Sequence, residues 1–127
     1  MNENQENQGL FSPYLRKKRL KEVATLIPQG ASVLDLACGA GYLSNRLPPS
    51  CRYWGADKIA PSKKPTHFED FYAVDLTDAG ALEYIKNRIP EQFDCITIIA
   101  FLEHIKDCSS FILNILPLLR DGGVIIG

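Results

Sequence analysis

The sequence predicts an α/β domain with a doubly wound, Rossmann-like and mostly parallel sheet, arranged in three α/β/α layers. Two patterns indicate this class. Short apolar stretches of strand length alternate with amphipathic stretches of helical spacing along most of the chain, which is typical of βαβ units. The first apolar stretch also runs directly into a pair of glycines and a helix-compatible segment. A switch of chain direction at that point predicts the strand order 3-2-1-4-5.

Five stretches are predicted as strands because they are short, apolar and bounded by glycine, proline or acidic residues. The fourth is the most apolar, as expected of a strand buried on both faces. The crossing between the second and third strands contains Pro61 and Pro65, so we expect an irregular basic loop or a single helical turn there. In chain order the predicted strands are Ser32–Leu36, Cys51–Ala56, Phe71–Val74, Phe93–Ile99 and Val124–Ile126.

Helices are predicted where apolar residues recur at helical spacing after a capping residue. Ser12 precedes Pro13, which suits an N-cap followed by proline at the first helical position. Thr77 or Asp78 is the expected cap of the third helix and Ser109 that of the fourth. Pro117 is expected to bend the fourth helix. The predicted helices are Pro13 to about Ile27, Tyr42–Leu47, the stretch through Ala81 to Ile89, and the stretch from Ser109 through Leu119.

Composition indicates one soluble domain. The chain has 127 residues, 46% of them hydrophobic, and a net charge of −1, so nothing attracts it strongly to nucleic acid or an anionic membrane. Residues 1–9 are predicted to be a disordered tail and residues 10–127 a single domain. The basic run Arg16–Lys21 is expected to be a solvated helix face, and the alternative is a site for an acidic substrate or partner. No apolar run has membrane-spanning length and no cysteines are paired by spacing, which favours the cytoplasm and disfavours zinc.

The central stretch is the one in which the first strand meets the glycines. Asp35 lies one residue before the end of the strand, and Ala37, Cys38, Gly39 and Gly41 form the turn after it. Glycines allow positive φ and close approach of the backbone to a ligand. The start of the following helix favours an anionic group. An acid just before the turn suits a ligand that also carries an ammonium or another cation. The stretch therefore predicts a small-molecule site at the carboxyl edge of the sheet.

Two further acids follow predicted strands. Asp57 comes directly after the second strand and sixteen residues after Gly41, close to where nucleoside-binding sheets place a carboxylate on ribose hydroxyls. Asp75 follows the third strand in the same way and is succeeded by Leu76. Because parallel strands end at one edge, both acids are expected beside the glycine turn.

These landmarks resemble those of class I methyltransferases that use S-adenosylmethionine, in particular the small-molecule branch. The first motif of that family is acid-x-Gly-x-Gly-x-Gly, and Ala37 replaces its first glycine. The segment Leu102-Glu103-His104, with Asp107, resembles the end of the family's fourth strand, and Gly122-Gly123 resembles a later turn in which Asp121 replaces a proline. The resemblance covers roughly residues 20–127 and stops after the fifth strand, so we expect the family's last strands to be absent from this chain.

The resemblance implies a cofactor and roles for individual residues. S-adenosylmethionine or S-adenosylhomocysteine is the expected cofactor, and a small molecule the expected methyl acceptor. Asp75 would receive the adenine amino group and Leu76 would lie along the ring. Lys58, Ala100 and Phe101 would complete the cofactor site. His104 is the candidate base, because its ordinary pKa lies near neutrality.

Alternatives stay open at this point. His104 could merely pack at the strand end, and Glu103, His104 and Asp107 match no standard metal spacing. A nicotinamide-dependent oxidoreductase is disfavoured by Ser44, where a third glycine is expected, and by Asp35. The chain could also be a cofactor-binding module without catalysis. Nucleic-acid substrates are disfavoured because no Asn/Asp-Pro-Pro-aromatic segment follows the fourth strand. The apolar edge of the fifth strand predicts that this edge is covered, either by self-association in a homo-oligomer or by residues outside this sequence.

Overall fold

The computed structural model describes residues 13–62, 68–99 and 101–127. The predicted tail at 1–9, the Ser12 cap and the predicted cofactor residue Ala100 lie outside these ranges. The predicted fold class is confirmed: one sheet has the order β3-β2-β1-β4-β5, and its neighbouring strands are parallel. The strands are β1 Ser32–Leu36, β2 Arg52–Asp57, β3 Phe68–Ala73, β4 Phe93–Thr97 and β5 Leu119–Ile126.

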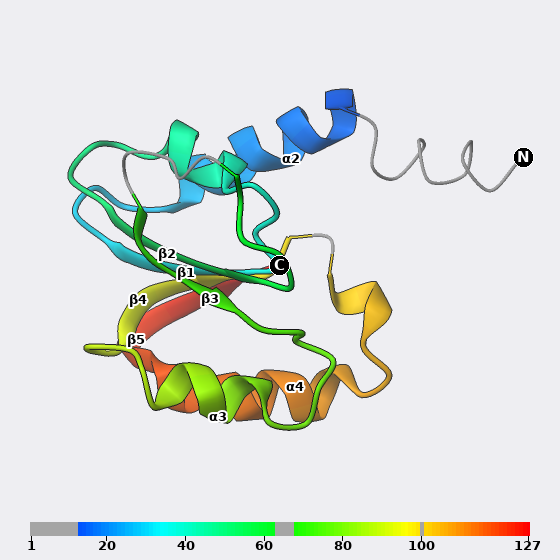
Figure 1. Ribbon diagram of the computed structural model, residues 1–127. Coiled ribbons are helices and arrows are strands. Elements are labelled where there is room, and N and C mark those ends of the chain that lie inside the picture. Colours follow the sequence, from blue (N-terminus) through cyan, green and yellow to red (C-terminus); the bar gives the residue numbers. More distant parts are fainter. Residues whose placement is uncertain (1–12, 63–67, 100) are drawn as a thin grey trace, which may run out of the picture.

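Helices cover both faces of this sheet (Figure 1). On one face lie α2, Pro13–Leu26, and a 3₁₀-helix, Tyr42–Arg46. On the other lie α3, Ala81–Lys86, and α4, Cys108–Ile115, which continues into a 3₁₀-turn at Leu116–Leu118. A further 3₁₀-turn, Leu102–His104, follows β4 at the carboxyl edge. No helix among the described residues is both long and apolar enough to cross a bilayer.

The strands separate two hydrophobic cores. Successive residues of β1 point to opposite faces, so Val33 packs with Leu20 of α2 and Tyr53 of β2, whereas Leu34 belongs to the core beneath α3 and α4. Ile85 of α3 is fully buried in that second core. Burial on both faces explains why β1 is buried along its whole length and reads as an apolar run interrupted only by Asp35.

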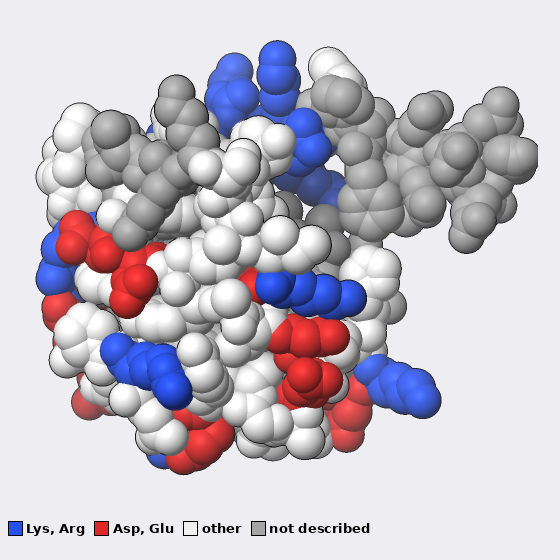
Figure 2. Space-filling model, in the orientation of Figure 1, with Lys and Arg blue, Asp and Glu red and all other residues white. Residues whose placement is uncertain are grey.

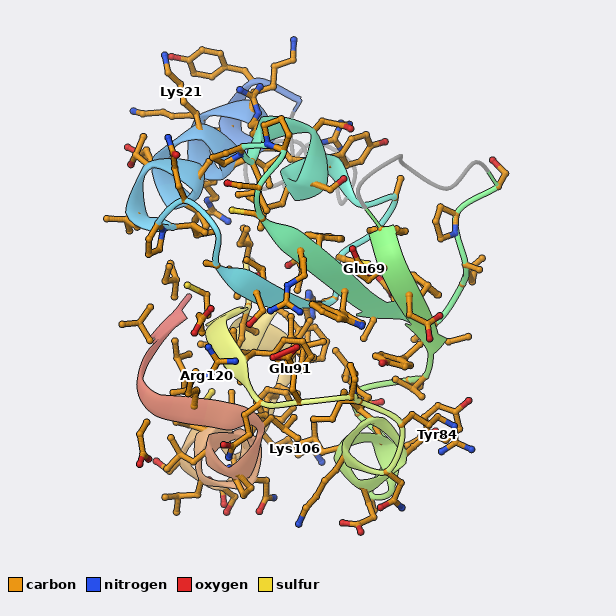
Figure 3. All side chains as sticks on the ribbon, turned by 90° about the vertical axis from the view of Figure 1, so that its left-hand side faces the viewer. Lys21, Glu69, Tyr84, Glu91, Lys106 and Arg120 are labelled. Carbon is orange, nitrogen blue, oxygen red and sulfur yellow. The ribbon has the colours of Figure 1, made fainter. Side chains whose placement is uncertain are left out.

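Ion pairs tie the strands together at the amino edge, opposite the glycine turn. Glu91 pairs with Arg52 of β2 at 2.7 Å and with Arg120 of β5 at 3.0 Å. Arg120 also contacts Asp94 of β4 at 2.6 Å, and the second oxygen of Asp94 accepts the Ser32 N–H of β1 at 2.9 Å. Figure 3 shows Arg120 and Glu91 beside each other at this edge. The network links four of the five strands, so it fixes their register away from the site.

Several predicted boundaries are wrong. β3 begins at Phe68 instead of Phe71, because Phe68 packs against Tyr53, with ring centroids 4.8 Å apart. The short helix predicted over Tyr42–Leu47 is present as a 3₁₀-helix that ends one residue earlier, at Arg46, and Pro48 and Pro49 follow it. Gly80 instead of Thr77 or Asp78 precedes α3.

The segment from α4 to β5 also differs from the prediction. Asp107 instead of Ser109 caps α4, accepting the Ser110 N–H at 3.0 Å. The α-helix ends at Ile115, so Pro117 lies in a 3₁₀-turn instead of bending a longer helix. β5 then begins at Leu119, and its pairing with β4 shifts between Phe93 and Cys95. The glycines predicted as a turn before the strand thus lie inside it as an irregularity, with Gly122 at a φ of 80°.

Candidate functional site

The glycine turn is built from three residues with left-handed backbone. The φ angles are 60° at Ala37, 59° at Gly39 and 81° at Gly41. Three N–H groups of the turn are engaged within the protein. Cys38 donates to the Ala56 carbonyl at 3.1 Å, Gly41 to the Cys38 carbonyl at 3.0 Å and Gly39 to a carboxylate. The turn therefore offers a surface for close approach, and these three amides are not spare donors for an anion.

Asp57 closes the turn from the end of β2. Its Oδ2 accepts the Gly39 N–H at 2.7 Å, and its Oδ1 accepts the N–H of Lys58 at 2.7 Å. A carboxylate offers about four lone-pair sites, so both oxygens keep capacity for hydroxyl donors. The carboxylate is thus fixed in orientation while remaining able to accept from a ligand.

Asp35 is the acid of the first motif and is almost completely buried. The β1 register places it between Gly55 of β2 and Thr97 of β4, and only 3% of it is exposed. Its Oδ2 accepts the Tyr53 hydroxyl at 2.5 Å and its Oδ1 accepts the Thr97 hydroxyl at 2.7 Å. Burial raises the pKa of Asp35 to about 6, against the opposite effect of the two hydrogen bonds.

A hollow of about 250 Å³, called here the inner lobe, lies between α2 and the turn. Besides Asp35 and the turn it is lined by Arg16 and Arg19 of α2, by Tyr42 and by Ile99. The Arg16 guanidinium lies 4.5 Å from the centre of the Tyr42 ring. Figure 2 shows the basic side chains gathered over α2. The sequence predicted both arginines as part of a solvated basic face and not as site residues, although their spacing of three on a helix puts them on one face.

A second hollow of about 380 Å³, the outer lobe, continues along the carboxyl edge and shares Ala37 and Asp57 with the inner lobe. Asp75 is its central acid. Its Oδ1 accepts both the hydroxyl of Thr77, at 2.6 Å, and the Thr77 N–H, at 3.0 Å. These bonds hold the pKa of Asp75 below its ordinary value. Its Oδ2 lies 3.9 Å from the Lys58 ammonium.

His104 borders the outer lobe and not the inner one. It ends the 3₁₀-turn after β4 and is exposed, with its ring centre 6.2 Å from that of Phe101. Phe101 packs in turn on Phe111 of α4, at 5.9 Å. The sequence segment predicted to end the fourth strand therefore forms the wall of the outer lobe.

The structure brings most of the predicted site residues to one edge. Gly41 shapes the turn but is not among the residues that line the inner or the outer lobe. The thiol of Cys38 is buried. Burial raises the pKa of this thiol above its ordinary value, which keeps it protonated. The predicted residues that line the inner lobe are Asp35, Ala37, Cys38, Gly39 and Asp57, and those that line the outer lobe are Ala37, Asp57, Lys58, Asp75, Leu76, Phe101 and His104.

Comparisons with known proteins agree with this geometry. A family described as "Methyltransferase domain" matches residues 8–127. The chain is 31% identical over 115 residues to the ubiquinone biosynthesis O-methyltransferase of Pseudomonas putida (strain GB-1), covering 86% of this chain and 47% of that protein. It is 28% identical over 105 residues to the mitochondrial enzyme of the same name from Schizosaccharomyces pombe, covering 76% of this chain and 37% of that protein. The chain thus spans less than half the length of these relatives.

Two solved structures share the fold. Coclaurine N-methyltransferase, crystallised with N-methylheliamine and S-adenosylhomocysteine, superposes with a TM-score of 0.66 at 23% identity, over 87% of this chain and 35% of that one. The plantazolicin methyltransferase, crystallised with a substrate analogue and S-adenosylhomocysteine, gives 0.67 at 18% identity, over 96% of this chain and 50% of that one. At these identities the likeness concerns the fold alone.

Proposed function

This chain belongs to the methyltransferase-domain family, and from that premise we propose that it binds S-adenosylmethionine, or its product S-adenosylhomocysteine, and takes part in methyl transfer to a small molecule. One observation carries the proposal. Two lobes of different chemistry lie along the carboxyl edge and meet at Ala37 and Asp57. This arrangement suits an extended ligand with an amino-acid end and a nucleoside end.

The inner lobe suits the amino-acid end. Methionine carries a carboxylate and an ammonium, and the sulfonium of S-adenosylmethionine adds a second positive charge. Arg16 and Arg19 are the candidate partners of the carboxylate, because guanidinium groups match carboxylate geometry. The buried Asp35 carboxylate supplies the charge that the cationic groups require. The engaged amides of the turn support this assignment, since the anionic group needs another donor.

The outer lobe suits the nucleoside end. Asp57 retains lone pairs on both oxygens, so it can accept from the two ribose hydroxyls. The two lone pairs of Asp75 Oδ1 are used by Thr77, which leaves Oδ2 for an adenine amino group. Leu76 and Phe101 supply apolar walls for the ring. Lys58 lies close enough to Asp75 to help orient it.

Methyl transfer from a sulfonium demands little covalent help. The bound cofactor supplies an activated methyl group, and the protein must align nucleophile, carbon and sulfur and exclude water. A base is needed only when the acceptor is protonated, and His104 stays the candidate for that role. Its position on the outer lobe means that the acceptor would have to reach the sulfur from the side of Phe101.

A hydroxyl-bearing small molecule is the acceptor that we propose, because the curated relatives at about 30% identity are named O-methyltransferases. A second candidate function is a cofactor-binding part that needs further segments for catalysis. The short span relative to these relatives favours it. Methyl transfer measured with hydroxyl and amine acceptors, in parallel with cofactor binding, separates the two. The cytoplasmic location and the exclusion of nucleic-acid substrates stay predictions from the sequence.

The binding site is tested by calorimetry with S-adenosylhomocysteine. Asp57→Ala should weaken binding by about 1–3 kcal/mol, because it removes charge-assisted hydrogen bonds. Gly39→Val should abolish binding, because Gly39 lines the inner lobe and its φ of 59° strains any residue with a Cβ. Asp70→Ala is the matched control, since Asp70 also accepts the N–H of its successor but lies on β3 away from both lobes. Unchanged affinity in both site variants would contradict the assignment.

The role of His104 is tested by separating turnover from binding. If His104 is the base, His104→Ala should lower turnover about a hundredfold or more while S-adenosylhomocysteine affinity holds. Should it only pack on Phe101, the variant would instead show a lower melting temperature with normal turnover. Steady-state rates, calorimetry and thermal melts on the same preparation distinguish these results.

A further inference from the structure

The Asp35 carboxylate is held by a pair of hydroxyl groups from two neighbouring strands. Tyr53 of β2 donates to Oδ2 at 2.5 Å, and Thr97 of β4 donates to Oδ1 at 2.7 Å. Thr97 and Tyr53 are themselves fully buried. Asp35 is 3% exposed yet lines the inner lobe. A carboxylate so deeply buried therefore has one open side, which faces the proposed ligand.

Charged and titratable groups surround this carboxylate from each packed element. Asp57 lies at the end of β2, the buried Cys38 thiol in the turn, Tyr42 on the 3₁₀-helix after it, and Arg16 and Arg19 on α2. Burial is the largest effect on the Asp35 pKa and raises it to about 6, and Asp57 acts in the same direction. The hydrogen bonds from Tyr53 and then Thr97 oppose both effects. The two hydroxyls thus lower the pKa of Asp35 and thereby favour its ionised form near neutral pH.

We propose that Tyr53 and Thr97 are positioning residues that keep Asp35 ionised for the cofactor, so that cofactor binding is coupled to deprotonation of Asp35. The inference rests on the proposed function, because the coupling requires a cationic ligand in the inner lobe. The ligand's ammonium stabilises the ionised carboxylate, and the charged carboxylate offsets the repulsion of that ammonium by Arg16 and Arg19. Neutral Asp35 leaves that ammonium without its counter-charge in a partly buried site.

The sign of the pH effect follows from linkage. In the empty protein the raised pKa means that Asp35 contributes stability fully present below about pH 4 and lost as the pH rises through about 6. A bound cation reverses that preference, so the ligand binds best when the proton is gone. Affinity should be level above about pH 7 and fall about fivefold between about pH 6 and about pH 5. Binding at about pH 5 should release close to one proton per ligand.

The experiment is calorimetry of the whole chain with S-adenosylhomocysteine from pH 5 to 8, in buffers of different ionisation enthalpy. Tyr53→Phe should move the midpoint of the affinity profile up by about one pH unit, giving about fivefold weaker binding at pH 6. Thr97→Val should act in the same direction and serves if Tyr53→Phe does not fold. Tyr72→Phe is the matched control, since its hydroxyl contacts the Arg88 carbonyl in the other core and the midpoint should stay.

Distinct outcomes overturn the proposal. Proton release and a midpoint that do not change in Tyr53→Phe and Thr97→Val would overturn the positioning role. A profile that persists in Asp35→Asn would assign the titration to another group and overturn the coupling. Both results leave the proposed function standing, because binding at pH 8 is measured in the same series. Failure of the unmodified chain to bind at pH 8 would overturn the proposed function and this inference together.

Discussion

Ala37 holds a backbone conformation that suits glycine. Its φ of 60° makes it the one non-glycine residue with positive φ among those described, and left-handed backbone costs an L-residue roughly 1–2 kcal/mol. The residue lies where the two lobes meet. The strain is therefore located at the ligand site, where the family motif has a glycine.

Ala37→Gly should relieve this strain. The gain is partly offset by the greater backbone entropy of glycine in the unfolded chain, so the unfolding free energy should rise by about 0.5–1 kcal/mol. Ala40→Gly is the matched control: Ala40 is exposed in the same turn without positive φ, and it should lose stability. Urea unfolding of both variants measures the difference. Equal effects in the two variants would show that Ala37 is not strained.

At this scale the sequence identifies the acids and glycines of the site because their chemistry restricts the residue type. Asp57 can be predicted from its place after a strand, and Gly39 from the positive φ that a tight turn requires. Arg16 and Arg19 cannot be separated from their basic neighbours in this way. The packing of Leu20 in the core decides which face of α2 lies against the glycine turn. This packing is a tertiary effect that the local sequence does not reveal.

Among the elements, α4 shows most clearly how a local contact sets a boundary. The Asp107 carboxylate accepts the Ser110 N–H and hydroxyl, and these bonds, the backbone one first, lower the pKa of Asp107. Ser109, the cap predicted from the sequence, lies inside the helix. Asp107 and Ser109, two positions apart in the chain, are both suitable cap residues, and only the fold distinguishes them.

Asp107→Ala should lower the melting temperature by several degrees, since it leaves helix N–H groups without their acceptor. Ser109→Ala should leave it nearly unchanged and is the matched control. Because the pKa of Asp107 is lowered in the fold, its contribution is present at neutral pH and is lost as the pH falls through that lowered pKa. Melts at pH 7 and pH 3 check both statements. A larger effect of Ser109→Ala would restore the predicted cap.

Element types were predicted well and element ends poorly, for a physical reason. The apolar runs of β1 and β4 indicate strands buried on both faces, whatever surrounds them. The end of α4 and the start of β5 depend instead on the pairing of Leu119 with Phe93, a contact between residues distant in the chain. The local sequence around Pro117 is equally compatible with a bend in a longer helix and with the end of the helix.

Positive and negative charges lie in different parts of the molecule, although the net charge of the chain is only −1. The sequence of α2 carries five basic residues and one acidic residue, so the rest of the chain is net negative. Basic side chains gather over α2 (Figure 2), and two of them, Arg16 and Arg19, line the inner lobe. The composition alone does not reveal this separation of charge, because a net charge sums over all residues regardless of their positions in the fold. The arrangement favours anionic groups approaching the site from the side of α2.

The outer edge of β5 is the remaining feature at this scale. Among the described strands β5 pairs only with β4. Its first half is irregular, which blunts the edge, but Val124–Ile126 carry no charge and Val124 is 45% exposed. An apolar, regular edge pairs readily with another strand. We therefore expect the 127-residue chain to self-associate through this edge.

Val124→Lys should shift the chain toward monomer, because a charged side chain on an edge strand opposes pairing with another strand. Leu113→Lys is the matched control, since Leu113 is an equally apolar side chain, 64% exposed on α4, that offers no strand edge. Sedimentation velocity over a concentration series measures the association of all three proteins. If Leu113→Lys reduces association as much as Val124→Lys, the contact is general hydrophobic adhesion and not strand pairing. If the unmodified chain stays monomeric at the highest concentration, the five strands close their own core and the expectation is wrong.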